Sequence, residues 1–107
     1  MSKETFDALM RGALKAGSVA VVVKLCVPFR PEGELSDEAA RLQRAAIARA
    51  QDTLLEELRR ERVGALKRFA TTPYLALHVD ARALLRLRSS PSVADVTEDS
   101  AMPAASQ

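Results

Sequence analysis

The chain has 107 residues, of which 48% are hydrophobic and 28% charged, and its formal net charge is +2 at pH 7. These values are typical of one globular domain with a single core. The single cysteine, Cys26, excludes an internal disulfide, and the apolar run at residues 19–27 is too short to cross a bilayer. The first residues lack a signal-peptide pattern, so we expect a cytoplasmic protein if the sequence is complete as given, or an extracellular one if it is excised from a secreted precursor.

The first two predicted elements are a short helix and a strand. Residues 2–16 carry apolar side chains at helical spacing, and Gly17 follows where a helix would end. Residues 19–27 are mostly β-branched and apolar up to Pro28, which cannot donate to a sheet, and they predict a strand. Because Cys26 lies in this run, we expect a buried or half-buried thiol with a structural role. The helical stripe comprises Phe6, Leu9, Met10, Ala13 and Leu14.

A loop and a long helix come next. Residues 28–34 contain two prolines and a glycine and predict a loop. Ser36 suits the N-cap of a helix that runs to about residue 60, with negative charge in its first turn. One face of this helix is apolar and should pack against the core. That face comprises Ala39, Ala46, Ile47, Ala50, Leu54 and Leu58.

The second half of the chain predicts a hairpin, a helix and a last strand. Residues 62–69 and 74–79 read as two strands, with a bulge at Gly64. Asp80 suits the N-cap of a helix at residues 81–89, and a strand follows at residues 93–97.

This order of elements predicts the fold class. Strand, helix, strand, strand, helix, strand is the ferredoxin-like βαββαβ order, an α+β two-layer sandwich in which two helices cover one face of an antiparallel sheet. We therefore expect a leading amphipathic helix at residues 1–17, the domain at residues 18–99 and an extended, flexible tail at residues 100–107.

The sheet face turned away from the helices is predicted to be unusually poor in charge. Alternation turns every second residue of each strand to that face. Small and moderately apolar groups with few charges suit contact with a flat partner, although such residues also occur on sheets without a partner. The outward residues are Ala20, Val22, Lys24 and Cys26 in the first strand and Tyr74, Ala76 and His78 in the third.

The last third of the chain resembles a known family. Phe69, a turn, the strand at residues 75–79, a helix rich in Leu and Arg, Pro91-Ser92-Val93 and the acidic pair Glu98-Asp99 occur in that order. Together they resemble the propeptide, or peptidase inhibitor, family of subtilisin-like serine proteases. The resemblance extends over residues 62–99. The helix predicted at residues 36–60 is longer than the family's.

The resemblance implies an inhibitor that also acts as an intramolecular chaperone in a protease zymogen. Its sheet would pack on two helices of the protease, in cis or in trans, and Glu98 and Asp99 would cap the N-termini of those helices. Thr97 stands where the family often has another acid. The tail would lie in the substrate cleft, with Met102 in an outer apolar subsite. The other cleft residues would be Pro103, Ala104 beside the specificity pocket and Ala105 in it.

Other classes have less support from the residues. An enzyme needs a nucleophile with a base, or a metal cluster, and the spacing of Cys26 and His78 supplies neither, so we predict no catalysis, no cofactor and no metal. RNA-recognition modules share the topology but stack bases on aromatic side chains, which the central strands lack, so we expect no nucleic-acid partner. No membrane contact is expected, and the free domain should be a monomer. A dimerising regulatory or small-molecule-sensing domain with the same fold stays open as the alternative.

Overall fold

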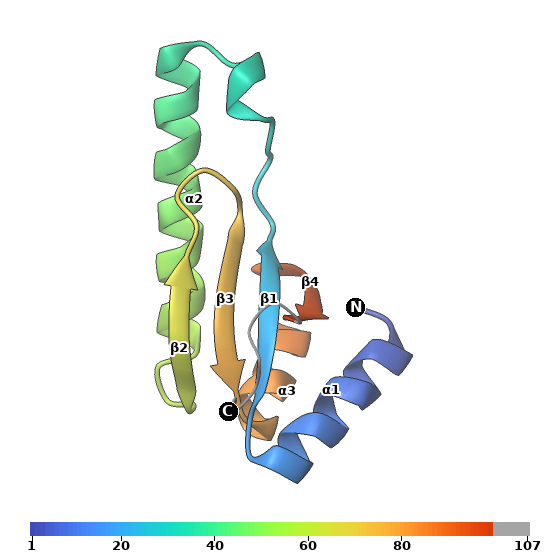
Figure 1. Cartoon of the computed structure of the whole chain (residues 1–107). Helices are drawn as coiled ribbons and strands as arrows, with labels where there is room; N and C mark the ends of the chain where they lie inside the picture. The colour runs from blue at the N-terminus through green and yellow to red at the C-terminus, as the bar shows by residue number, and fades with distance from the viewer. Residues whose placement is uncertain (100–107) are drawn as a thin grey trace.

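The computed structural model describes residues 1–99, and its elements follow the order expected from the sequence. A leading helix precedes the βαββαβ series, and a short 3-10 helix lies in the first crossover (Figure 1). The elements are α1 (Lys3–Ala16), β1 (Val19–Leu25), η1 (Glu32–Glu34), α2 (Asp37–Glu57), β2 (Val63–Arg68), β3 (Tyr74–Val79), α3 (Ala81–Ser89) and β4 (Val93–Glu98).

The four strands form one antiparallel sheet in the order β2-β3-β1-β4. In Figure 1, α2 and α3 lie behind the strands, and α1 lies beside the sheet at the lower right. The predicted α+β two-layer fold is confirmed.

The core lies between the inner face of the sheet and the three helices. Val21 and Val23 of β1 are fully buried, as are Leu75 and Leu77 of β3. Alternation along each strand turns these residues to the helices. The helices contribute Phe6 and Leu9 from α1, Leu54 from α2, Leu58 just after it, and Ala83, Leu84 and Leu87 from α3. The leading helix is therefore part of the same core as the rest of the domain.

The helix ends form where local chemistry predicts them. The Ser2 hydroxyl accepts from the Thr5 N–H, the Ser36 hydroxyl from the Ala39 N–H, and the Asp80 carboxylate from the Ala83 N–H. Each bond satisfies one of the N–H groups that a helix start leaves unpaired. At the end of α1, Gly17 has φ 89°, a left-handed conformation that glycine adopts without a steric penalty.

The end of β1 differs from the prediction. The strand stops at Leu25 rather than at residue 27, and the register with β4 already shifts between Lys24 and Leu25. The last bonds run from the Leu25 N–H to Pro73 O and from the Cys26 N–H to Ser92 O. The chain then leaves the sheet. Cys26 is consequently exposed, and the expectation of a buried thiol is wrong.

Two other expectations are refined. Leu14 was placed on the apolar stripe of α1 but is 70% exposed, because that side of the helix is turned away from the core. The bulge expected at Gly64 occurs between Gly64 and Lys67, and Ala65 there has φ 49°. The extra residue in the strand is therefore accommodated at Ala65.

The N-terminal half of α2 extends beyond the sheet (Figure 1), which explains why Ala39 and Ala46 are only half-buried. The segment between β1 and α2 runs beside it. The side-chain amide of Gln43 accepts from the Arg30 N–H at 3.0 Å and donates to the Arg30 carbonyl at 2.9 Å. Arg44 binds both oxygens of Glu32 at 2.6 Å, and this pairing lowers the pKa of the Glu32 carboxyl and raises the pKa of Arg44.

Candidate protein interface

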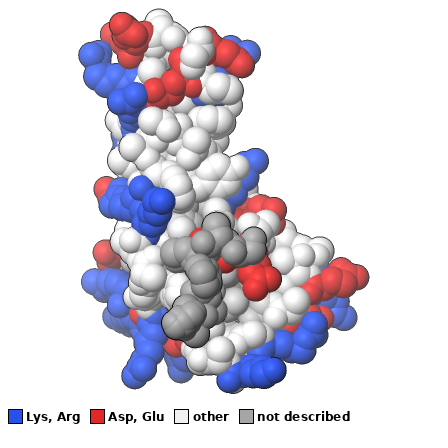
Figure 2. Space-filling model, viewed as in Figure 1, with Lys and Arg blue, Asp and Glu red and all other residues white. Residues whose placement is uncertain are grey.

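The sheet face opposite the helices, here called the open face, is the candidate interface. It is the face seen in Figures 1 and 2, and none of the helices within residues 1–99 covers it. Outside the region drawn in grey, Figure 2 shows Lys, Arg, Asp and Glu mainly around the margins of this view. The strand registers place on it Ala20, Val22 and Lys24 of β1, Tyr74, Ala76 and His78 of β3, Gly64 and Lys67 of β2, and Asp95 and Thr97 of β4.

The centre of the open face is flatter and less accessible than the sequence suggests. Ala20 and Ala76, expected to be exposed, are 4% and 2% exposed. Ala76 lies between Val22 on β1 and Lys67 on β2, and Ala20 lies opposite His78. A single methyl group in such a position lies below the ends of its longer neighbours. The accessible groups of this face are therefore Val22, Tyr74 and His78, which are half-buried, and the lysines around them.

The acidic residues at the end of β4 are divided between the two faces. Glu98 pairs with the buried Val21 and borders a hollow beside Leu9 and Gly12 of α1, so its side chain lies on the helix side. The Asp99 N–H donates to Ala20 O at 2.9 Å, which continues the pairing by one residue. Alternation thus places Asp99 on the open face, and the two predicted capping residues do not act from the same side.

Opposite charges line up along the β1–β4 pair. Lys24 lies directly across from Asp95, and Asp95 also binds the N-terminal amine of Met1 at 3.2 Å. Thr97 lies across from Val22. An acidic margin therefore follows β4, with Lys24 directly beside it, whereas Lys67 lies on β2, on the other side of the uncharged centre. A partner must accommodate both signs of charge around an apolar middle.

Sequence reasoning missed part of this face. Lys67, Gly64 and Asp95 belong to it, and pairing register was the information needed to place them. The predicted cleft residues Met102, Pro103, Ala104 and Ala105 lie outside the residues that the structure describes.

Cys26 and His78 do not form a reactive pair. His78 lies opposite Ala20, six residues along β1 from Cys26. At about 3.3 Å per residue the two side chains are roughly 20 Å apart, too far for proton transfer. Within residues 1–99, no group of three or more His, Cys, Asp or Glu side chains is arranged to hold a metal ion. In the same part of the chain, no helix combines the length and the hydropathy needed to cross a membrane.

Comparison with known proteins adds no relative. No family model, curated protein or solved structure matches the chain.

Proposed function

We propose that this chain is a propeptide-type inhibitor and folding helper of a subtilisin-like serine protease, which it binds through the open face. The observation that carries the proposal is the uncharged centre of that face, made by Ala20, Val22 and Ala76 on the two central strands. A flat apolar centre with a polar rim is the composition that protein interfaces use. The resemblance of residues 62–99 to such propeptides names the partner.

Asp99 is the residue best placed to cap a helix of the protease. It follows the last strand on the open face, next to Thr97. The N–H groups at a helix start are unpaired and carry partial positive charge, so they attract a carboxylate or a hydroxyl oxygen. We assign this role to Asp99 with support from Thr97, and we do not extend it to Glu98, which lies beside α1.

The chaperone role follows from the same contact. A rigid sheet that binds two helices of an incompletely folded protease stabilises the folded form by mass action. The tail at residues 100–107 would then occupy the substrate cleft as a product-like strand, a role that rests on the resemblance.

Inhibition kinetics test the proposal. The purified chain should inhibit a subtilisin-like protease stoichiometrically, and Val22→Asp should weaken inhibition about 100-fold, because binding would bury an unpaired carboxylate. Thr53→Asp, an exposed change on α2, is the matched control and should leave inhibition unchanged. A chain ending at residue 99 should lose most of the inhibition.

Two results would contradict it. One is the absence of inhibition across several subtilisin-like proteases. The other is a stable dimer by light scattering that Val22→Asp dissociates, which would favour the dimerising regulatory domain instead.

A further inference from the structure

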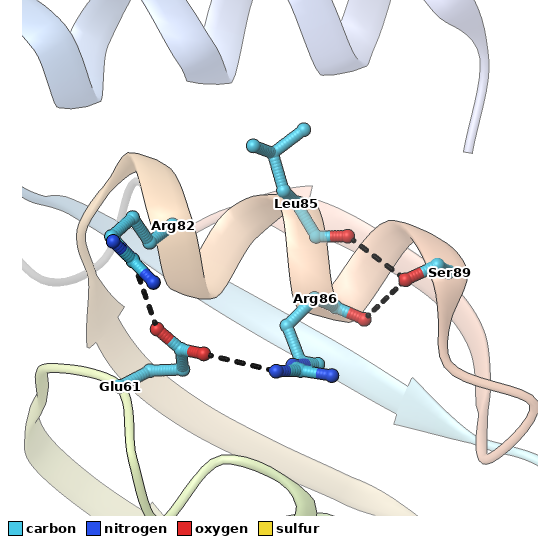
Figure 3. Close-up of a pocket in the computed structure, with 5 residues that line it drawn as sticks. All are labelled: Glu61, Arg82, Leu85, Arg86 and Ser89. Carbon is cyan, nitrogen blue, oxygen red and sulfur yellow. Dashed lines mark hydrogen bonds and ion pairs between the residues drawn. The ribbon is translucent and has the colours of Figure 1, made fainter.

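A second surface, on the helix side of the molecule, gathers arginines around one buried carboxylate. The Glu61 side chain, in the turn between α2 and β2, is only 7% exposed. Its two oxygens lie 3.7 Å from Arg82 Nε and 3.4 Å from Arg86 Nη2. Figure 3 shows both arginines pointing from α3 toward Glu61. Arg60 and Arg62, which flank Glu61 in the sequence, are exposed as well.

Glu61 holds these arginines together without neutralising them. Arg82 and Arg86 are four residues apart on one helix face, where like charges repel, and the shared carboxylate offsets that repulsion. Two arginines share one carboxylate, so the three side chains together carry a net positive charge. Each guanidinium has five N–H donors, and the Arg82 side chain is 84% exposed. Most of its donors therefore face solvent.

We propose that this surface, here called the arginine surface (Glu61, Arg82, Leu85 and Arg86), binds an acidic segment of a partner protein. Guanidinium groups bind carboxylates through paired hydrogen bonds, and Glu61 already shows a carboxylate seated between Arg82 and Arg86. A carboxylate of the partner would bind guanidinium groups that Glu61 already holds in position.

An apolar neighbour indicates a protein partner rather than a nucleic acid. Leu85 lies between the two arginines in sequence, borders the same hollow as Glu61, and is 48% exposed. In Figure 3 the Leu85 side chain points away from Glu61, on the side of α3 opposite the two guanidinium groups. A peptide that places glutamates on the arginines can therefore place an apolar side chain on Leu85. Single-stranded nucleic acids gain affinity by stacking bases on aromatic rings, and no aromatic residue is among those that border this hollow.

The arginine surface is independent of the proposed inhibitor function. It lies on α3 and on the turn after α2, whereas the protease would cover the opposite face of the sheet. Both partners are thus able to bind at once. The arginine surface would then tether the domain to a second, acidic protein while the open face binds its own partner.

Fluorescence titration with a labelled synthetic peptide, in which glutamates alternate with leucines, tests the proposal on the full chain. We expect saturable binding that weakens as salt is raised. The double variant R82A/R86A should weaken binding at least about tenfold. R41A/R49A removes two exposed arginines of α2 and should change it less than twofold. Glu61→Gln should strengthen binding, because it removes a competing negative charge, and a merely structural role for Glu61 predicts no such gain.

Circular dichroism establishes that each variant is folded. If R82A/R86A unfolds, the single change Arg82→Glu replaces it, since that side chain is largely in solvent and should lose binding without loss of helix content. Equal losses in the R41A/R49A control would overturn the proposal, as would failure of the wild-type chain to bind the peptide. Tighter, Arg82-dependent binding of a single-stranded oligonucleotide of equal charge would also overturn it, in favour of a nucleic-acid surface.

Discussion

The buried amide of Gln51 on α2 accepts a hydrogen bond from the guanidinium of Arg68 on β2, with Arg68 Nε 3.0 Å from Gln51 Oε1. The same amide donates to the carbonyls of Phe69 and Tyr74, at 2.8 and 3.0 Å, on either side of the β2–β3 turn. Arg68 also donates to Ala48 O and pairs with an aspartate of α2. One helix side chain therefore holds both ends of the turn to α2, and each nitrogen of the Arg68 guanidinium has a partner on α2.

Replacement of Gln51 by leucine tests this network. The change leaves two carbonyls and Arg68 without their amide partner, and we expect it to lower the free energy of unfolding by about 2–3 kcal/mol. Urea unfolding at pH 7 measures the loss. Thr53→Ala, two residues along the same helix, removes only an exposed hydroxyl that bonds back to Arg49 O and should stay within about 0.5 kcal/mol of wild type. Equal effects in the two variants would contradict the role given to Gln51.

Two adjacent serines provide a second matched pair. The Ser90 hydroxyl donates to Glu57 Oε1 at 2.6 Å and accepts from the Ser92 N–H, whereas the Ser89 hydroxyl only bonds back to carbonyls of its own helix. We expect Ser90→Ala to destabilise the domain by about 2 kcal/mol, because a charged acceptor loses its donor. Ser89→Ala should be nearly neutral by the same thermal unfolding measurement. A neutral Ser90→Ala would show that Glu57 finds water instead.

The leading helix should contribute to global stability. Phe6 is 7% exposed, and the Arg88 guanidinium lies 4.2 Å from the centre of its ring. Phe6→Ala should cost about 3 kcal/mol through lost burial and the lost cation–π contact. Leu14→Ala on the same helix should cost less than about 0.5 kcal/mol, since Leu14 is 70% exposed. If both variants unfold at the wild-type denaturant concentration, α1 is not part of the cooperative unit.

The Glu32–Arg44 pair predicts an acid-dependent change in the projecting half of α2. Because Arg44 holds the pKa of the Glu32 carboxyl below its ordinary value of 4.5, the stabilisation is fully present above that value and is lost as the pH falls through the lowered pKa. Carbon-detected NMR titration should show Glu32 titrating at lower pH in the wild-type chain than in Arg44→Gln. Arg44→Gln should return the pKa of Glu32 to its ordinary range. An unchanged titration in that variant would contradict the pairing.

Local elements were predictable because their causes are local. Ser36 and Asp80 cap helices through bonds to residues three positions away, so the sequence itself contains both partners. Gly17 likewise marks the end of α1 by its own backbone chemistry. The end of β1 was not predictable in this way, because the last bonds of this strand are made with distant residues. The Leu25 N–H donates to Pro73 O and the Cys26 N–H donates to Ser92 O.

The candidate interface was predictable in outline only. Alternation correctly assigned Val22 and Tyr74 to the face away from the helices, because a strand has a fixed period of two. It did not show that Ala20 and Ala76 are shielded, since shielding comes from residues on neighbouring strands. It also did not separate Glu98 from Asp99, because that requires the β1–β4 register.

What the sequence determined by itself is the set of elements, their order and the fold class, since periodicity, caps and turn residues act over a few positions. Only the tertiary structure decided which polar groups meet. Glu61 joins Arg82 and Arg86 across more than 20 residues, and Gln51 reaches both ends of a distant hairpin turn. Such contacts depend on how α2, α3 and the sheet pack, and no short-range pattern records them. Packing therefore decided which residues complete the open face and which residues form the arginine surface.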